Sequence, residues 1–158
     1  MSAIFFVMVL KMLDVRKIAG AFFAASLALA LSGCSGGSEY TMLFPEIGVG
    51  DKKEIIRKEK RRLPKEPSQG VIAMFVEELV LGPQTPRLRP LFSRGTHVEF
   101  CFMGGNDLYV DISRDALFEL SDAVDIQGGI SLFEENIRKN FKNIENIVLF
   151  IDGRVVNE

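Results

Sequence analysis

The sequence is poor in the residues that most often carry chemistry. Its 158 residues include two cysteines, one histidine and no tryptophan. Two cysteines cannot build a disulfide framework or a multi-cysteine metal site. The length favours one domain, and the thirteen phenylalanines predict a core of Phe, Leu and Ile.

The N-terminal region has the layout of a secretory signal. Arg16 and Lys17 precede an uncharged apolar run at 18–31, which ends in the small residues of "LSGC" at 31–34. The run is too short for a spanning helix and is typical of a signal peptide. Its end resembles a bacterial lipobox, in which Cys34 becomes the lipidated first residue. The alternative is an ordinary signal peptide with an incidental cysteine.

We therefore expect a signal peptide at 1–33, a lipidated cysteine with a short tether at 34–38, and a single domain at 39–158. The extra apolar stretch before the basic residues has no role in a signal peptide, so Met12 is a candidate for the true start. The tether after the cysteine spans at most about 14 Å. The domain is thus expected at the extracytoplasmic face of a membrane, with the lipid on Cys34 and no other cofactor. Export argues against a nucleic-acid partner.

The patterns within 39–158 predict strands and two helices. Strands are expected at 39–44 and within the charged run 52–62, which ends before Pro64. A helix is expected from Pro67 to Gly82, with a broad apolar face. A second helix carries one stripe, with Ser131 and Glu134 as a capping pair or a slightly earlier start at the preceding glycines. The stripe residues are Ile130, Phe133, Ile137 and Phe141.

A hairpin is expected between the helices, with its turn at 104–107. Its first strand alternates Val98, Phe100 and Phe102 with His97, Glu99 and Cys101. Strict alternation predicts that the first three side chains face the core. The return strand alternates Leu108, Val110 and Ile112 with polar residues, and 147–151 forms a closing strand before an Asp-Gly turn and a short last strand. This order predicts an α+β fold, a two-layer sandwich of a small mixed or antiparallel sheet with two helices.

Four segments in series resemble the GerMN domain: "EELVLGP" at 77–83, "LRPLFSRGT" at 88–96, "LYVDIS" at 108–113 and "NIVLFIDG" at 146–153. GerMN domains occur in sporulation and germination proteins and in many bacterial lipoproteins. The resemblance implies a small fold akin to ring-building motifs, which pack side by side in envelope assemblies, and no established catalytic residues. The dense charge of 52–62 departs from the family pattern.

The basic run is the strongest candidate for a functional surface. It has seven cations against two acids: Lys52, Lys53, Arg57, Lys58, Lys60, Arg61 and Arg62. Near a lipid anchor these cations are suited to anionic headgroups, and they are equally suited to the acidic remainder of a neighbouring copy. The structural alternative is an edge strand kept soluble by its charges.

Other candidate sites have weaker patterns. His97 and Cys101 lie roughly 13 Å apart in a regular strand, too far for a catalytic dyad. The scattered aspartates lack the spacing of a calcium loop, and the glycines at 104–105 precede no helix that would make a phosphate loop. Arg87, Arg89 and Arg94 either hold an anion or belong to a connector that Pro86 and Pro90 shape.

We expect a lipid-anchored binding or assembly module of the cell envelope, with no catalytic activity and no metal. The expected partners are the membrane, through the anchor, and envelope proteins or further copies of the chain. One alternative is an enzyme or accessory acting on cell-wall peptidoglycan, which would need convergent acids in a polar pocket. Another is a small-ligand binder, which would need an enclosed apolar cavity.

Overall fold

The computed structural model describes residues 36–46, 55–118 and 124–156. The lipidation candidate Cys34 and the cations Lys52 and Lys53 lie outside these ranges. Residues 37–158 form one compact unit. Its elements in chain order are β1 (Ser38–Pro45), β2 (Ile56–Leu63), α2 (Val71–Leu81), β3 (Val98–Gly104), β4 (Asp107–Ile112), the short 3₁₀ helix η1 (Arg114–Leu117), α3 (Ile126–Asn140), β5 (Asn146–Ile151) and β6 (Arg154–Val155).

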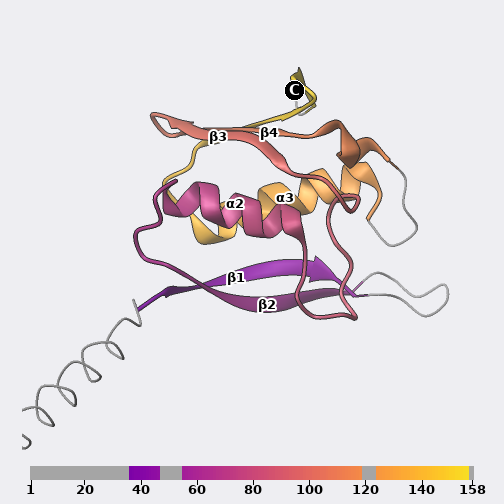
Figure 1. The fold of residues 1–158 in the computed structure, drawn as a ribbon, viewed down its shortest axis with the longest axis horizontal. Helices are drawn as coiled ribbons and strands as arrows, with labels where there is room; N and C mark the ends of the chain where they lie inside the picture. The colour runs from indigo at the N-terminus through magenta and orange to yellow at the C-terminus, as the bar shows by residue number, and fades with distance from the viewer. Residues whose placement is uncertain (1–35, 47–54, 119–123, 157–158) are drawn as a thin grey trace, which may run out of the picture. The chain divides into compact units, whose positions relative to one another are not determined.

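Four of the strands form a mixed sheet in the order β3-β4-β5-β6. β4 and β5 are parallel and are connected through α3, whereas the two outer pairs are antiparallel. The two helices cover one face of this sheet, and the antiparallel ribbon of β1 and β2 lies on the far side of the helix layer (Figure 1). The predicted α+β sandwich of two helices and a small mixed sheet is confirmed. The first two strands form a ribbon of their own.

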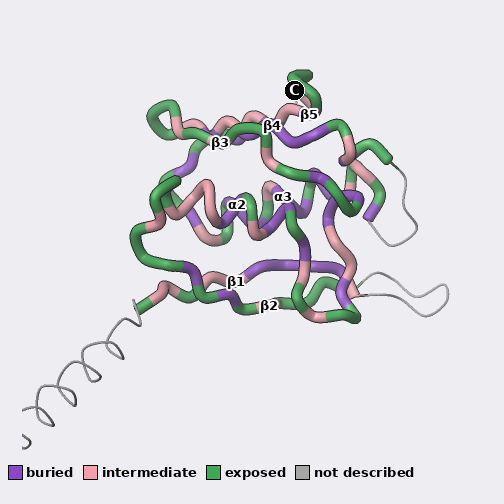
Figure 2. The backbone as a smooth tube through the Cα atoms, viewed as in Figure 1, coloured by how far each residue is buried: buried purple, intermediate pink, exposed green. Residues whose placement is uncertain are grey.

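The core lies between these layers (Figure 2). α2 contributes Phe75, Val76, Leu79 and Val80, all buried. The predicted stripe of α3 is buried over its whole length, and the alternating apolar residues of β4 face the helices. The stripe and the alternation were therefore correctly predicted. Tyr40 joins the core at the end of the ribbon, where its ring packs against Phe75 and Phe141.

The starts of both helices differ from the predicted ones. α2 begins at Val71, four residues after the predicted start at Pro67. Gly70 and Gly82 flank α2 with positive φ angles of 85° and 96°, so glycine suits both ends. α3 begins at Ile126, because the side chain of Asp125 accepts the backbone N–H of Gly128 at 3.0 Å. The predicted Ser131 cap is wrong, since this hydroxyl lies inside the helix and donates to the Gln127 carbonyl.

β3 contains a bulge that changes which side chains face the core. The pairing with β4 shifts between Val98 and Phe100, so that Glu99 is an extra residue. Val98 still faces the helices, but beyond the bulge the core-facing residues are Cys101 and Met103. The prediction that Phe100 and Phe102 face the core is therefore wrong: both lie on the outer face of the sheet.

Two asparagines of α3 join the helix to the ribbon. The side-chain amide of Asn136 accepts from Leu43 N at 2.7 Å and donates to Leu43 O at 3.0 Å. Asn140 makes the same pair of bonds with Thr41, at 3.1 Å and 2.8 Å. These amides pair with backbone N–H and C=O groups on the edge of β1 that faces away from β2, as a further strand would. The ribbon is thereby fixed to the helix layer through its backbone.

Candidate interaction surface

The period of β2 divides the basic run into two sets. Arg57, Glu59 and Arg61 lie on the side that faces α2 and its following loop, and Lys58, Lys60 and Arg62 lie on the opposite side. The exposed fractions follow this division, because only the first set includes a buried cation. The five cations of the run that the structure describes therefore do not act as one surface.

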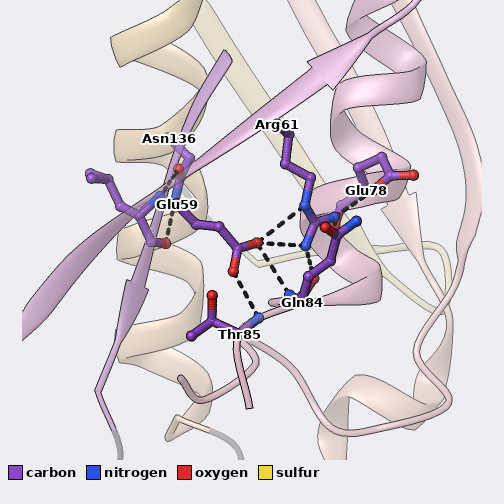
Figure 3. A network of polar contacts seen from close by, with 8 residues as sticks. Glu59, Arg61, Glu78, Gln84, Thr85 and Asn136 are labelled. Carbon is purple, nitrogen blue, oxygen red and sulfur yellow. Dashed lines mark hydrogen bonds and ion pairs between the residues drawn. The ribbon is translucent and has the colours of Figure 1, made fainter. Parts of the chain in front are cut away.

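Arg61 is a structural residue (Figure 3). Its side chain is 4% exposed, pairs with Glu59 at 2.8 Å and with Glu78, and donates to the carbonyl oxygen of Gly82 at 2.6 Å. Glu59 also accepts the backbone N–H groups that open the loop after α2, at 3.1 Å from Gln84 and 2.9 Å from Thr85. The network thus fixes β2 to the C-terminal end of α2.

The hydrogen bonds around Glu59 keep its carboxylate ionised. Burial alone would raise the pKa of Glu59, but hydrogen bonds from Thr85, Gln84 and Arg61 lower that pKa below its ordinary value. A charge on Glu59 is consistent with its role as the central acceptor of the network. The sequence signal for this inward-facing pair was Glu59, the one acid of β2 among its cations.

The outer set forms a row of exposed cations, which we call the basic row: Lys58, Lys60 and Arg62. Lys60 contacts Glu39 across the ribbon at 2.7 Å, and this hydrogen bond and charge lower the pKa of the Glu39 carboxyl. The backbone groups of Lys58 and Lys60 point away from β1, because their partners Leu43 and Thr41 direct their own N–H groups to α3. The basic row therefore follows an edge of the ribbon.

Arg57 lies at the far end of the ribbon and has an internal partner. Its guanidinium pairs with Glu46 at 2.8 Å while remaining half exposed. Glu46 also lies 4.0 Å from the guanidinium of Arg87 in the proline-containing connector. This acid therefore links β2, the end of β1 and the connector.

The connector after α2 is held in place by backbone contacts. Glu46 forms an isolated bridge with Leu88, and Arg89 N donates to Pro45 O at 2.8 Å. Leu88, Leu91 and Phe92 are buried in the core. These contacts support the connector interpretation of the segment that contains Arg87, Arg89 and Arg94.

His97 and Cys101 do not form a catalytic pair. The bulge turns Cys101 toward α2, where burial and the charge of Glu77 raise the pKa of its thiol to about 11. His97 is exposed, 3.2 Å from the carbonyl oxygen of Gly95 and 3.0 Å from Glu99, and these contacts raise the pKa of its imidazole. The expectation that the two cannot act together agrees with this geometry, although the predicted shared face is wrong.

Two pockets and the placement of possible metal ligands bear on the alternative functions. A pocket of about 180 Å³ lies between the start of α2 and β3, and one of about 350 Å³ lies along the connector beside Pro83 and Arg94. Over the described ranges, no group of three or more His, Cys, Asp and Glu side chains is placed to hold a metal ion. Neither α2 nor α3, the helices of the described part, has the length and apolarity that crossing a bilayer requires.

Comparisons with known proteins identify the fold. No family model matches the chain, and no curated protein sequence matches it. The tandem GerMN domains of the sporulation protein GerM from Bacillus subtilis align over 77% of this chain with a TM-score of 0.57 and 11% identity. The first GerMN domain of the same protein aligns over 75% of this chain and 86% of its own length, with a TM-score of 0.52 and 18% identity. The chain has a GerMN-like fold.

The GerMN-like domain covers only part of the larger of these structures. It spans about two fifths of the tandem GerM structure, 41% of that chain. A candidate lipoprotein from Clostridium perfringens aligns over 78% of this chain and 80% of its own, with a TM-score of 0.46 and 16% identity. The similarity to GerM establishes the fold, and the function must be argued from this chain's own residues.

Proposed function

We propose that this chain is a lipid-anchored module of the bacterial cell envelope that binds or assembles with other envelope components and catalyses no reaction. The anchor is an acyl lipid on Cys34, and the domain works on the extracytoplasmic side of the membrane. The lipobox-like segment 31–34 and the GerMN-like fold support this proposal.

The observation that carries the binding role is the basic row. Arg61 is bound within the internal network and Arg57 pairs with Glu46, but Lys58 and Arg62 project from the ribbon into solvent. Such a row prevents edge-to-edge aggregation, and it also presents clustered positive charge to an acidic partner. We propose that the basic row both prevents aggregation and binds an acidic partner.

The position of the tether supports contact with neighbours in the envelope. β1 begins at Ser38, which pairs with Leu63, and Glu39 pairs with Arg62. The basic row therefore starts at the end of the ribbon where the chain enters the domain. A short tether keeps this end near the membrane, where other anchored proteins are concentrated.

Replacing Cys34 by Ala tests the anchor. The C34A variant should move from the membrane fraction to the soluble fraction and lose labelling by radioactive fatty acid, because the acyl chains supply the membrane affinity. The matched control is C101A, which removes the other cysteine and should stay in the membrane. Retention of C34A in the membrane fraction would contradict the proposal.

Crosslinking in intact cells tests the binding role. The wild-type chain should be captured with an envelope protein or a further copy of itself, and charge reversal at Lys58 and Arg62 (K58E with R62E) should reduce that capture. Recovery of the monomer alone at every crosslinker length would refute a binding or assembly role.

A further inference from the structure

The outer face of the four-stranded sheet carries a continuous set of aromatic rings, which we call the aromatic face: Phe100, Phe102, Tyr109 and Phe150. Phe100 lies 5.7 Å from Phe102 and 5.8 Å from Phe150, between ring centroids. Phe102 stacks on Tyr109 at 5.0 Å. The rings come from three neighbouring strands and form one patch.

This patch is exposed because of the bulge in β3. Phe100 is 39% exposed and Phe102 is 53% exposed, whereas Cys101 and Met103 between and beyond them face the helices. The helices occupy the opposite face of the sheet (Figure 1). Grouped aromatic side chains on a solvent-facing sheet mark an interaction site more often than scattered single residues do.

Two aspartates of β4 lie beside the aromatic face. Asp107 and Asp111 lie on the same face of β4 as Tyr109. Asp107 accepts a hydrogen bond from the Asn146 side-chain amide at 2.7 Å, and Asp111 accepts from the backbone N–H of Gly153 at 3.1 Å. Asp111 is buried at 7% exposure, whereas Asp107 is partly exposed, so Asp107 is the carboxylate that lies beside the rings at the surface. The combination of rings with a carboxylate fits a partner with cations on long apolar stems.

The ribbon of the same chain, on the other side of the helix layer, carries cations on long apolar stems. The basic row projects from the ribbon, and Ile56, 43% exposed, continues it on the same side of β2. Its side chains recur every second residue, roughly 6.6 Å apart. Phe100 and Phe102 recur with the same period on β3. Two strands laid against each other can therefore place successive cations over successive rings.

We propose that the aromatic face binds the basic row of a second copy of this chain. This inference rests on the proposed assembly role and names the partner. The two surfaces lie on opposite layers of one domain, so the contact is head-to-tail and leaves one surface of each kind free (Figure 1). Copies therefore add one after another in a line, and the assembly does not close at a dimer.

The place where the chain enters the domain from its lipid anchor is compatible with such a line of copies. The chain enters the ribbon at Ser38, at a strand end and not on the outer face of the ribbon. If the strands stand away from the membrane, the aromatic face and the basic row both face sideways. Every copy in the line can then keep its lipid in the same bilayer. A stack of copies perpendicular to the membrane would prevent this, because the tether is too short.

The first experiment measures self-association of the full-length lipidated protein in detergent micelles by sedimentation velocity. The wild-type should form species larger than a dimer, and their proportion should fall as salt rises. The variants K58E/R62E and F100T/F102T should each weaken association by about tenfold or more. The matched controls are K139E/K142E, at an exposed position of α3 and an exposed position just after it, and L81S, at an exposed leucine; both should associate as the wild-type does.

Mixing distinguishes the proposed contact from other modes of association. K58E/R62E retains the aromatic face, and F100T/F102T retains the basic row, so an equimolar mixture should form heterodimers and nothing larger. Circular dichroism and thermal unfolding show whether each variant is folded. A monomeric wild-type, or a mixture that does not pair although both variants are folded, would overturn the inference.

A vesicle assay separates a membrane role of the basic row from the proposed one. The C34A protein should bind vesicles of anionic phospholipid no more tightly when Lys58 and Arg62 are present than in K58E/R62E. A strong loss of vesicle binding in K58E/R62E, with unchanged self-association, would assign the row to lipid headgroups and refute the contact between copies. Failure of self-association with capture of another envelope protein would refute only this inference and leave the proposed function standing.

Discussion

At the scale of residues, Arg61 and Arg62 are adjacent in the chain and opposite in environment. Arg61 is enclosed by Glu59, Glu78 and the Gly82 carbonyl, whereas Arg62 projects into solvent. The sequence predicted a charged strand but not which cations face inward, because the segment has too few apolar residues to set a register. The inward-facing acid Glu59 was the available signal.

Replacing Arg61 by Leu should destabilise the domain by about 3 kcal/mol, because it leaves Glu59 and the Gly82 carbonyl without their charged donor. Urea unfolding followed by circular dichroism measures the free energy of unfolding. The neighbouring control, R62L, removes an exposed cation and should change that free energy by less than about 0.5 kcal/mol. Equal effects of the two substitutions would contradict the structural role of Arg61.

At the scale of elements, two features of the structure could not be predicted from the sequence patterns alone. The alternation in β3 correctly placed Val98, but one extra residue at Glu99 reversed the faces beyond it. A period of two carries no information about such an insertion, because the bulge is set by pairing with β4. Asn136 and Asn140 are spaced four residues apart beside the apolar stripe, which is a visible signal, but their backbone partners lie more than ninety residues away.

Replacing Asn136 by Leu should cost about 2–4 kcal/mol of stability. The substitution leaves the buried N–H and C=O of Leu43 without partners, and unsatisfied buried groups lose about 1–3 kcal/mol each. Amide hydrogen exchange should show faster exchange at Leu43 than in the wild-type. The control N143A alters an exposed asparagine beyond α3 and should leave both quantities unchanged. Slow exchange at Leu43 in N136L would contradict the proposed attachment of β1 to the helix.

At the scale of the whole molecule, the order of strands and helices was predictable because each element has its own local pattern. The buried stripe of α3 and the alternation of β4 predicted the side of each element that faces the core. The separation of the first two strands into a ribbon across the helix layer was not predictable in this way. It depends on contacts between distant segments, such as those of α3 with β1.

The folded unit should be independent of the N-terminal region. Its buried apolar residues run from Met42 to Ile151, so a chain that starts at Gly37 retains the whole core. Its unfolding midpoint should lie within about 3 °C of that of the full chain, because a stability change below about 0.5 kcal/mol shifts the midpoint no further in a domain of this size.

A chain that starts at Met42 provides the matched comparison. It lacks Tyr40, whose ring packs against Phe75 and Phe141, and Thr41, which bonds to Asn140 through both backbone groups. Thermal unfolding should therefore occur at a distinctly lower temperature than in the chain that starts at Gly37. Equal midpoints for these two chains would show that the first half of β1 adds nothing to stability, whereas an unfolded Gly37 chain would show that the domain requires the residues before it.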